Sequence, residues 1–410
     1  MHAADTALEA SPQPPSADAA HAAGAVSNAP PQPPSADAAH AAKHEQHLVV
    51  DVLNFLIFFV PVNNKRFENA SAWTLLREMK LRVASFMTAC SHARITPHFV
   101  IDCGFASTEC GTKWRKRRER EIKEGYKAMP YYIDTALGAA LRARGGDVIQ
   151  APNVDADDVV IATALHYSGD VLSQDRDMLR YTDVNWHSTR LYESFRLNRH
   201  GRLELHPRSD MHNTAHERQA RALRLELEHW RMPQMKMVSA VISNGVLLRG
   251  NSDSFTQSMG NMHMLARPLR QALYARLGVD SVREEIPCWD AEQNRVVWSA
   301  DDVAPDAALD ALLHDPPAAY AWLAQADAAH GPAQAVQKRY AVRQNRRQWR
   351  SYSRAILVAE YCLNAQQLAG AHVDAEALTT LAQSIDPLFM PELDLRAAIA
   401  RQRAPARRYR

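Results

Sequence analysis

The stretch HLVVDVLNFLIFFV, residues 47–60, decides the fold class of this 410-residue chain. It opens with a short apolar run, leucine followed by two valines, that ends at Asp51. Three similar runs follow: FVID, which ends at Asp102, then VIQAP at 148–152 and VLSQD at 171–175. Their apolar residues are consecutive rather than alternating with polar ones, which is typical of strands buried on both faces.

Longer helical patterns separate these four runs. They cover residues 70–93, 112–144 and 156–168. Strands that alternate with helices favour a parallel sheet covered by helices. We therefore expect an α/β fold with a parallel twisted sheet, over residues 47–210.

The two ends of the chain differ in composition from the rest. Residues 1–46 carry the string PQPPSADAAHAA twice, at 12–23 and 31–42, without branched or aromatic side chains. Such a segment buries too little apolar surface to offset its ordering entropy, so we predict a disordered tail. The last residues, 401–410, form a basic tail.

The region 211–400 is predicted to be mostly α-helical. A helix with one break at Pro233 is expected over AHERQARALRLELEHWRMPQMKMVSAVIS, residues 215–243. Further helical patterns cover 264–277, 304–329, 333–366 and 373–386.

Composition excludes several classes of protein. The chain has 48 basic and 46 acidic residues, so attraction to nucleic acid would have to come from local patches. Its 5 cysteines form no CxxC pair, the longest apolar run is too short to cross a bilayer, and no secretory signal pattern opens the chain. We expect an intracellular protein, nuclear or cytoplasmic, that is neither secreted nor in a membrane.

Acidic residues follow all four predicted strands. In an open α/β sheet, ligands bind outside the carboxyl ends of the strands. The residues delivered to that edge are Asp51, Asp102, Asp155, Asp157, Asp175 and Asp177. Asp158 is one position further along a helix and should face another direction.

So many like charges at one edge would repel one another unless a cation joins them. Mg²⁺ or Mn²⁺ takes oxygen ligands, and two such ions can clamp a phosphodiester, one at the attacking and one at the leaving oxygen. The pattern therefore predicts a site for two divalent ions. A simpler interpretation stays open for each residue, because an Asp after a strand is often a turn residue or helix cap, as at Asp155.

The order and spacing of these motifs resemble the flap-endonuclease/XPG superfamily of PIN-like nucleases. The segments that carry the resemblance are VVDVLNFL, FVIDCG, DADD and SQDRD. Within that superfamily, VIDCGFASTECGTKWRKRREREI and RPLRQALY look most similar to the Asteroid family, to about residue 280. The resemblance implies metal-ligand and catalytic roles for the six aspartates named above.

A basic segment, KWRKRRER at 113–120, follows Asp102. In the flap nucleases the corresponding helical arch grips phosphate, so the resemblance implies phosphate contacts for Lys113, Arg117 and Arg120. Interleaved glutamates leave two other interpretations open, a solvated helix with internal ion pairs and a nuclear-localisation patch.

The sequence thus predicts a Mg²⁺-dependent endonuclease or exonuclease that hydrolyses single-stranded or branched DNA or RNA. The alternative is a nuclease-like scaffold that binds RNA or protein without cutting. Two features motivate this alternative. The chain lacks the Met-Gly opening of the classical nucleases, and it lacks their glycine-rich motif for holding duplex DNA.

Overall fold

The structure, a computed structural model, describes most of the chain between residues 46 and 389. The described residues are 46–61, 70–102, 112, 115–117, 119–120, 130, 132–149, 155–209, 220–223, 246–248, 262–290, 292–329, 346–373 and 376–389. The tails expected at 1–46 and 401–410 therefore lie outside the described residues, apart from Gln46. Within the described part, no helix has the length and apolar character needed to span a bilayer.

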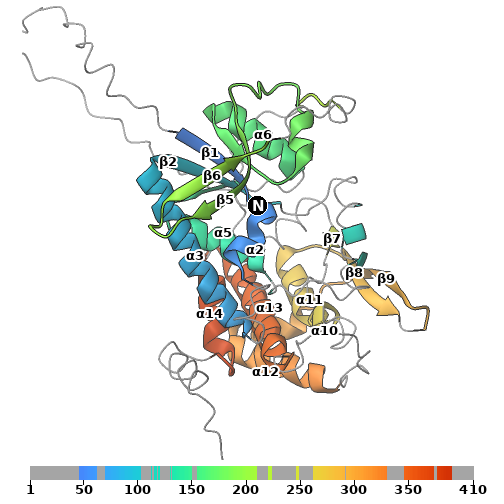
Figure 1. Ribbon diagram of the computed structural model, residues 1–410. Helices are drawn as coiled ribbons and strands as arrows, with labels where there is room; N and C mark the ends of the chain where they lie inside the picture. The colour runs from blue at the N-terminus through green and yellow to red at the C-terminus, as the bar shows by residue number, and fades with distance from the viewer. Residues whose placement is uncertain are drawn as a thin grey trace, which may run out of the picture. The chain divides into compact units, whose positions relative to one another are not determined.

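A six-stranded sheet lies in the first half of the chain, in the order β3-β2-β1-β4-β5-β6 (Figure 1). All neighbouring pairs are parallel except the last, in which β6 runs antiparallel to β5. The expected α/β class with a parallel sheet is confirmed, whereas β5 and β6 were not anticipated. The strands are β1 Gln46–Asp51, β2 Ile95–Val100, β3 Asp147–Ile149, β4 Asp170–Leu172, β5 Leu191–Leu197 and β6 Leu203–Pro207.

Helices cover both faces of the sheet, because successive side chains of a strand point to opposite faces. Leu48 and Val50 of β1 belong to a core shared with helices α3 and α5, whereas Val49 packs in a second core with α6. All three residues are fully buried, which explains why the apolar run is continuous. The helices are α3 Ala72–Ala93, α5 Ile133–Arg142 and α6 Ala156–Tyr167.

Helix α3 illustrates how local sequence sets an element's bounds. The hydroxyl of Ser71 accepts a hydrogen bond from the Thr74 amide at 3.1 Å and caps the first turn. Buried residues recur every three or four positions, and the helix ends where Arg94 adopts a left-handed φ of 57°.

The described residues after β6 are largely helical, as expected, but one predicted helix is broken. The pattern over 304–329 forms a 3₁₀ helix and an α-helix separated at Asp315, because the two prolines that follow disfavour a helical conformation there. The elements are α10 Met262–Leu265, α11 Arg267–Leu277, η4 Ala307–His314, α12 Pro316–Ala329, α13 Arg346–Leu368 and α14 Ala377–Ile385.

This region also holds a small sheet that the sequence did not predict. Strand β8 (Val282–Asp290) pairs antiparallel with β9 (Arg295–Val303) and parallel with β7 (Val246–Leu248). A further correction concerns the helix expected over 215–243, since its described part, 220–223, is not helical and Arg221 forms a β-bridge with Tyr181.

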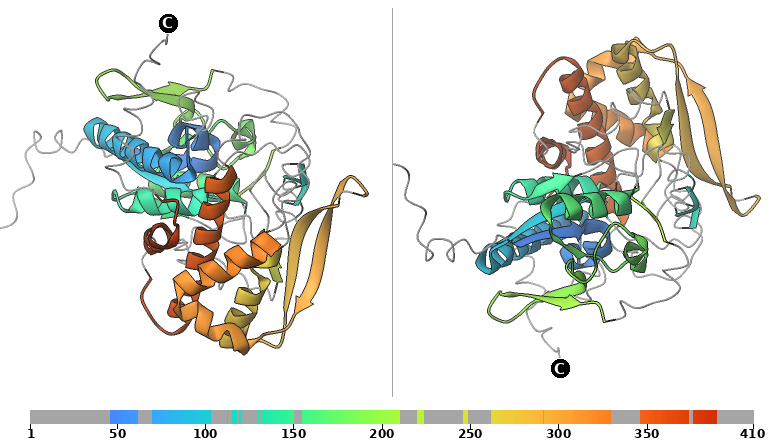
Figure 2. Two further views of the ribbon diagram at one scale, coloured as in Figure 1. Left: turned by 90° about the horizontal axis from the view of Figure 1, so that it is seen from below. Right: turned by 90° about the horizontal axis from the view of Figure 1, so that it is seen from above.

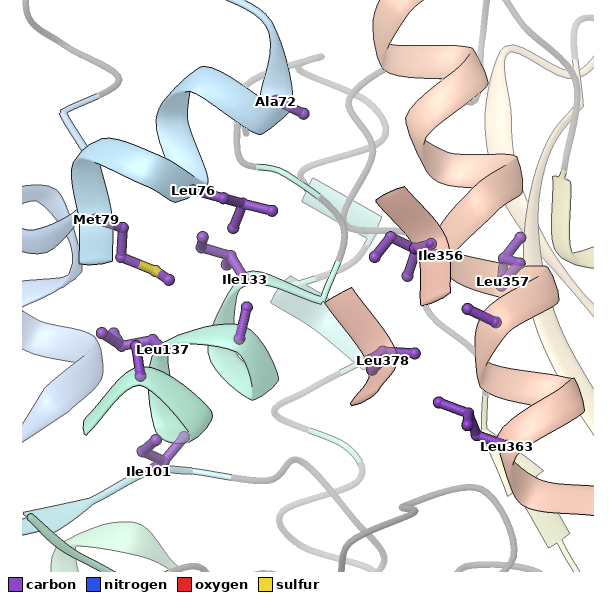
Figure 3. Packing of buried hydrophobic residues seen from close by; sticks show 14 of the residues in the cluster. Ala72, Leu76, Met79, Ile101, Ile133, Leu137, Ile356, Leu357, Leu363 and Leu378 are labelled. Carbon is purple, nitrogen blue, oxygen red and sulfur yellow. The ribbon is translucent and has the colours of Figure 1, made fainter. Parts of the chain in front are cut away.

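The sheet layer and the later helices share one hydrophobic core. Figure 3 shows Leu76 of α3 and Ile133 of α5 on one side of this core, with Ile356 of α13 on the other. At its edge, Trp73 packs against the ring of Tyr352 with centroids 4.7 Å apart. Residues before and after position 211 therefore pack as one body.

Candidate active site

The carboxyl ends of β1 and β4 lie side by side at the centre of the sheet. Val50 is level with Leu172, so Asp51 and Ser173, the next residues, are neighbours. The strand order reverses here, because the chain runs outward from β1 to β3 and then returns through α6 to β4. Such a switch point is where open α/β sheets bind ligands.

Asp51 is a buried carboxylate held by neutral donors. Its side chain is 7% exposed, and its Oδ2 atom accepts a 2.9 Å hydrogen bond from the Ser173 hydroxyl and a second from the Asn54 amide. Burial raises the pKa of Asp51 to about 6, against the opposing effect of the Ser173 and Asn54 hydrogen bonds. The negative charge of Asp175 adds to the increase, so these two carboxylates interact.

Ser173 connects Asp51 to the loop that carries Asp175. Its hydroxyl oxygen accepts a hydrogen bond from the Asp175 amide at 3.1 Å. The Oδ1 atom of Asp175 then accepts from the Asp177 amide at 2.9 Å and caps the short 3₁₀ helix Arg176–Arg180. Arg208, which is mostly buried, donates to the carbonyl of Gln174 at 2.7 Å and fixes the loop from behind.

The other predicted ligands each have a partner of their own. Asp102 lies 3.8 Å from Arg117, and Asp177 pairs with Arg180 at 3.3 Å. The remaining pair opens helix α6. Asp155 caps that helix by accepting from the Asp157 amide at 3.3 Å, and its Oδ2 atom lies 3.9 Å from Arg221.

Asp158 shares Arg221 with Asp155, one of the predicted ligands. It accepts a 2.5 Å hydrogen bond from the Tyr181 hydroxyl and pairs with Arg221, whose guanidinium lies over the Tyr181 ring. Desolvation and the nearby Asp158 hold the pKa of Tyr181 above its ordinary value. The cluster fastens the 220–223 segment beside the start of α6.

Asp51 and Asp175 fit the ligand chemistry of Mg²⁺, whereas the full set of six is not gathered. Within the described ranges, no three His, Cys, Asp or Glu side chains are close enough to hold one ion. The pair offers carboxylate oxygens, the donors that Mg²⁺ prefers, and Mg²⁺ commonly takes only one or two carboxylates with waters. A divalent cation beside Asp51 would also offset its repulsion by Asp175.

The basic segment is described in part. Residues 115–117 and 119–120 are helical, whereas Lys113 lies outside the described residues. Arg117 and Arg120 are both exposed, and Arg117 is the one that reaches Asp102. The basic segment therefore adjoins the acidic edge of the sheet.

Three residues of this site carried no sequence-based role. Ser173 stands inside the SQDRD motif, so its place before the two aspartates was an available signal. Asn54 lies one helical turn after Asp51, but nothing in the surrounding sequence distinguishes it from a surface asparagine. Arg221 reaches Asp158 across 63 positions, which no local pattern reveals.

A second polar cluster lies at the opposite, amino ends of the strands. The Nε2 atom of His98 lies 3.0 Å from His47 Nδ1, and its Nδ1 atom lies 2.9 Å from Asp147. Its ring also stacks on Tyr167, with centroids 3.8 Å apart. These contacts join the first residues of β1 and β3 to the middle of β2.

The fold and the site together define an α/β protein with a mostly parallel sheet flanked by helices and an acidic switch point. Comparison with protein-family models, with curated proteins and with solved structures finds no match to this chain. Its function must therefore be argued from the site itself.

Proposed function

We propose that the chain is a Mg²⁺- or Mn²⁺-dependent nuclease of the PIN-like, XPG/Asteroid kind. It would hydrolyse phosphodiester bonds in single-stranded or branched DNA or RNA. The observation that supports this most is the buried Asp51, whose charge is repelled by the partly buried Asp175, at the switch point of the sheet. A buried carboxylate with only neutral donors and a like charge nearby is costly, and a ligand cation removes that cost.

Asp51 and Asp175 would hold the metal, with Asp102, Asp155, Asp157 and Asp177 as further candidate ligands. When bound, the ion would polarise a phosphoryl oxygen and lower the pKa of a coordinated water. Ser173 and Asn54 orient the Asp51 carboxylate through its Oδ2 atom, which leaves the second oxygen with acceptor capacity.

The basic segment suits the binding of the substrate backbone. Arg117 is 60% exposed and stands next to the acidic edge, so its guanidinium can exchange Asp102 for a phosphate. Arg120, also exposed, extends the positive charge along the same helix. Lys113 is proposed as a third contact on the grounds of its sequence position.

A cleavage assay tests this function. The full chain is incubated with 5′-flap, bubble and single-stranded DNA and RNA, with Mg²⁺ or Mn²⁺. Asp175→Asn keeps the helix-capping oxygen but removes the charge, so it should abolish cleavage without disturbing the fold. Asp302→Asn, which alters a 69% exposed aspartate of the β9 strand, is the matched control and should retain activity. Equal cleavage by wild type and Asp175→Asn would sink the proposal.

The second candidate is a nuclease-like scaffold that binds RNA or protein without cutting. It is favoured by the finding that no three candidate ligands within the described residues are close enough to hold an ion. Calorimetric titration with Mn²⁺ separates the two. No heat of binding, combined with binding of labelled RNA, would support the scaffold, whereas saturable Mn²⁺ binding lost in Asp175→Asn would support the nuclease.

A further inference from the structure

The two faces of the β8–β9 hairpin contact different parts of the chain. Along a strand, neighbouring side chains point to opposite faces. Glu284 is fully buried, with its carboxylate bound by Arg270 at 2.6 and 2.7 Å and by the Tyr274 hydroxyl at 2.7 Å. The next residue, Glu285, therefore lies on the other face. The hairpin is thus anchored on helix α11 and presents its opposite face to another part of the chain.

That opposite face contacts the basic helix, which is the helical part of the basic segment at residues 115–117 and 119–120. Glu285 is level with Ala300 and Pro287 with Trp298, so Glu285 and Trp298 share one face of the hairpin. Arg115 pairs with Glu285, and its guanidinium lies 5.0 Å from the centre of the Trp298 ring. The Trp298 indole donates to Glu119 at 2.8 Å. Figure 2 shows the short helical fragment beside the hairpin in both views.

The helix is consequently held between the hairpin and the acidic edge of the sheet. Arg115 and Glu119 are four positions apart, so they occupy one side of the helix. Arg117, two positions from each, points elsewhere and lies 3.8 Å from Asp102. Arg120 stays exposed. The hairpin uses one side of the helix for attachment and leaves other basic residues available to a ligand.

We propose that the β8–β9 hairpin is a positioning element for nucleic-acid binding, in which Trp298 and Glu285 fix the basic helix so that Arg117 and Arg120 receive the phosphate backbone beside the acidic site. This inference rests on the proposed nucleic-acid function. It assigns a role to a hairpin that carries no recognisable motif of its own.

Fluorescence anisotropy of a labelled single-stranded oligodeoxynucleotide, in EDTA to prevent cleavage, tests the inference. Arg117→Ala and Trp298→Ala should each weaken binding by about fivefold, the order expected when one or two phosphate contacts are lost. Arg295→Ala, an exposed residue at the hairpin tip, is the control and should change binding by much less than Trp298→Ala.

A double-mutant cycle distinguishes positioning from general stability. If Trp298 acts by placing the helix, Arg117→Ala should cost much less affinity in the Trp298→Ala background than in wild type. Purely additive losses would overturn the inference, and so would unchanged binding by Trp298→Ala. Should Trp298→Ala unfold, Trp298→Phe supplies the same test, because it keeps an aromatic ring but is smaller than indole and lacks the N–H donated to Glu119.

The outcome is separable from that of the nuclease assay. Coupled losses of binding without any cleavage would support the positioning role and overturn the catalytic proposal. Cleavage that persists together with unaltered binding by Trp298→Ala would support the catalytic proposal and overturn the positioning role. A wild type that binds neither the DNA probe nor an RNA of the same sequence would overturn the inference.

Discussion

The hydroxyl of Ser173 donates a hydrogen bond to Oδ2 of Asp51 at 2.9 Å, and thereby joins the ends of the two central strands of the sheet. Ser173 is fully buried, so no water replaces this bond if the hydroxyl is removed. The hydroxyl oxygen of Ser173 also accepts a hydrogen bond from the Asp175 amide. Ser173 is therefore the common partner of both proposed metal ligands.

Ser173→Ala should move the acidic limb of the cleavage rate to higher pH. The hydrogen bond from Ser173 lowers the pKa of Asp51, so its loss raises that pKa above the present value of about 6. Asp51 must be ionised to serve as a ligand, hence the loss of rate below neutral pH. A pH–rate profile measures the effect, and Ser85→Ala on the exposed side of α3 is the control. Superimposable profiles for wild type and Ser173→Ala would contradict this role.

Asp51→Asn should stabilise the metal-free protein at neutral pH. Because the pKa of Asp51 is raised from 3.8 to about 6, the folded state binds its proton more tightly than the unfolded state. The stability that the protonated Asp51 contributes to the folded state is fully present below pH 3.8 and is lost as the pH rises through about 6. Relative to wild type, the free energy of unfolding of Asp51→Asn should gain up to about 3 kcal/mol between those limits. Urea unfolding at several pH values checks this, and a pH-independent difference would refute it.

Mg²⁺ should stabilise the wild-type chain. A ligand that binds only the folded state adds about 2.7 kcal/mol at a concentration of 100 times its dissociation constant. We expect the melting temperature to rise with Mg²⁺ at pH 8, and the rise to vanish in Asp175→Asn. NaCl at matched ionic strength controls for screening of the acidic edge. An identical rise in both proteins would place the ion elsewhere.

Arg221 and Asp158 should be coupled in stability. Arg221 is the cation beside Asp158, whose side chain is 13% exposed, so removing Arg221 leaves the Asp158 carboxylate with the Tyr181 hydroxyl but without its charge partner. Chemical unfolding of Arg221→Ala, Asp158→Ala and the double variant should give a coupling energy of about 1 kcal/mol, discounted for the partial exposure of Arg221. Additive effects would indicate that the 220–223 segment is held by other contacts.

The buried pair of Arg270 and Glu284 should be costly to break. Both side chains are fully buried, and Glu284→Ala leaves the guanidinium without its charge partner. The free energy of unfolding should fall by about 3–5 kcal/mol. The exposed pair of Arg196 and Glu204 is the control, and Glu204→Ala should cost far less than Glu284→Ala. Similar losses at both pairs would contradict the prediction.

Sequence patterns anticipated the elements whose signals are local. The apolar run Leu48–Val50 predicted a strand buried on both faces, and the spacing in α3 predicted a helix. Strand β9 was missed because its residues are only partly buried and give no clear alternation. The β-bridge at Arg221 was missed because contacts with Tyr181 and Asp158 override a helical pattern.

By itself, the sequence determined that four apolar runs are followed by acidic residues, because hydrophobic burial and strand length are encoded locally. It also determined the α/β class, since strands and helices alternate. Only the tertiary structure decided that Asp51 and Asp175 are neighbours, that Ser173 joins them, and that Trp298 meets the basic helix. The reason is physical: strand order and side-chain pairing depend on how distant segments pack, and no local pattern records that choice.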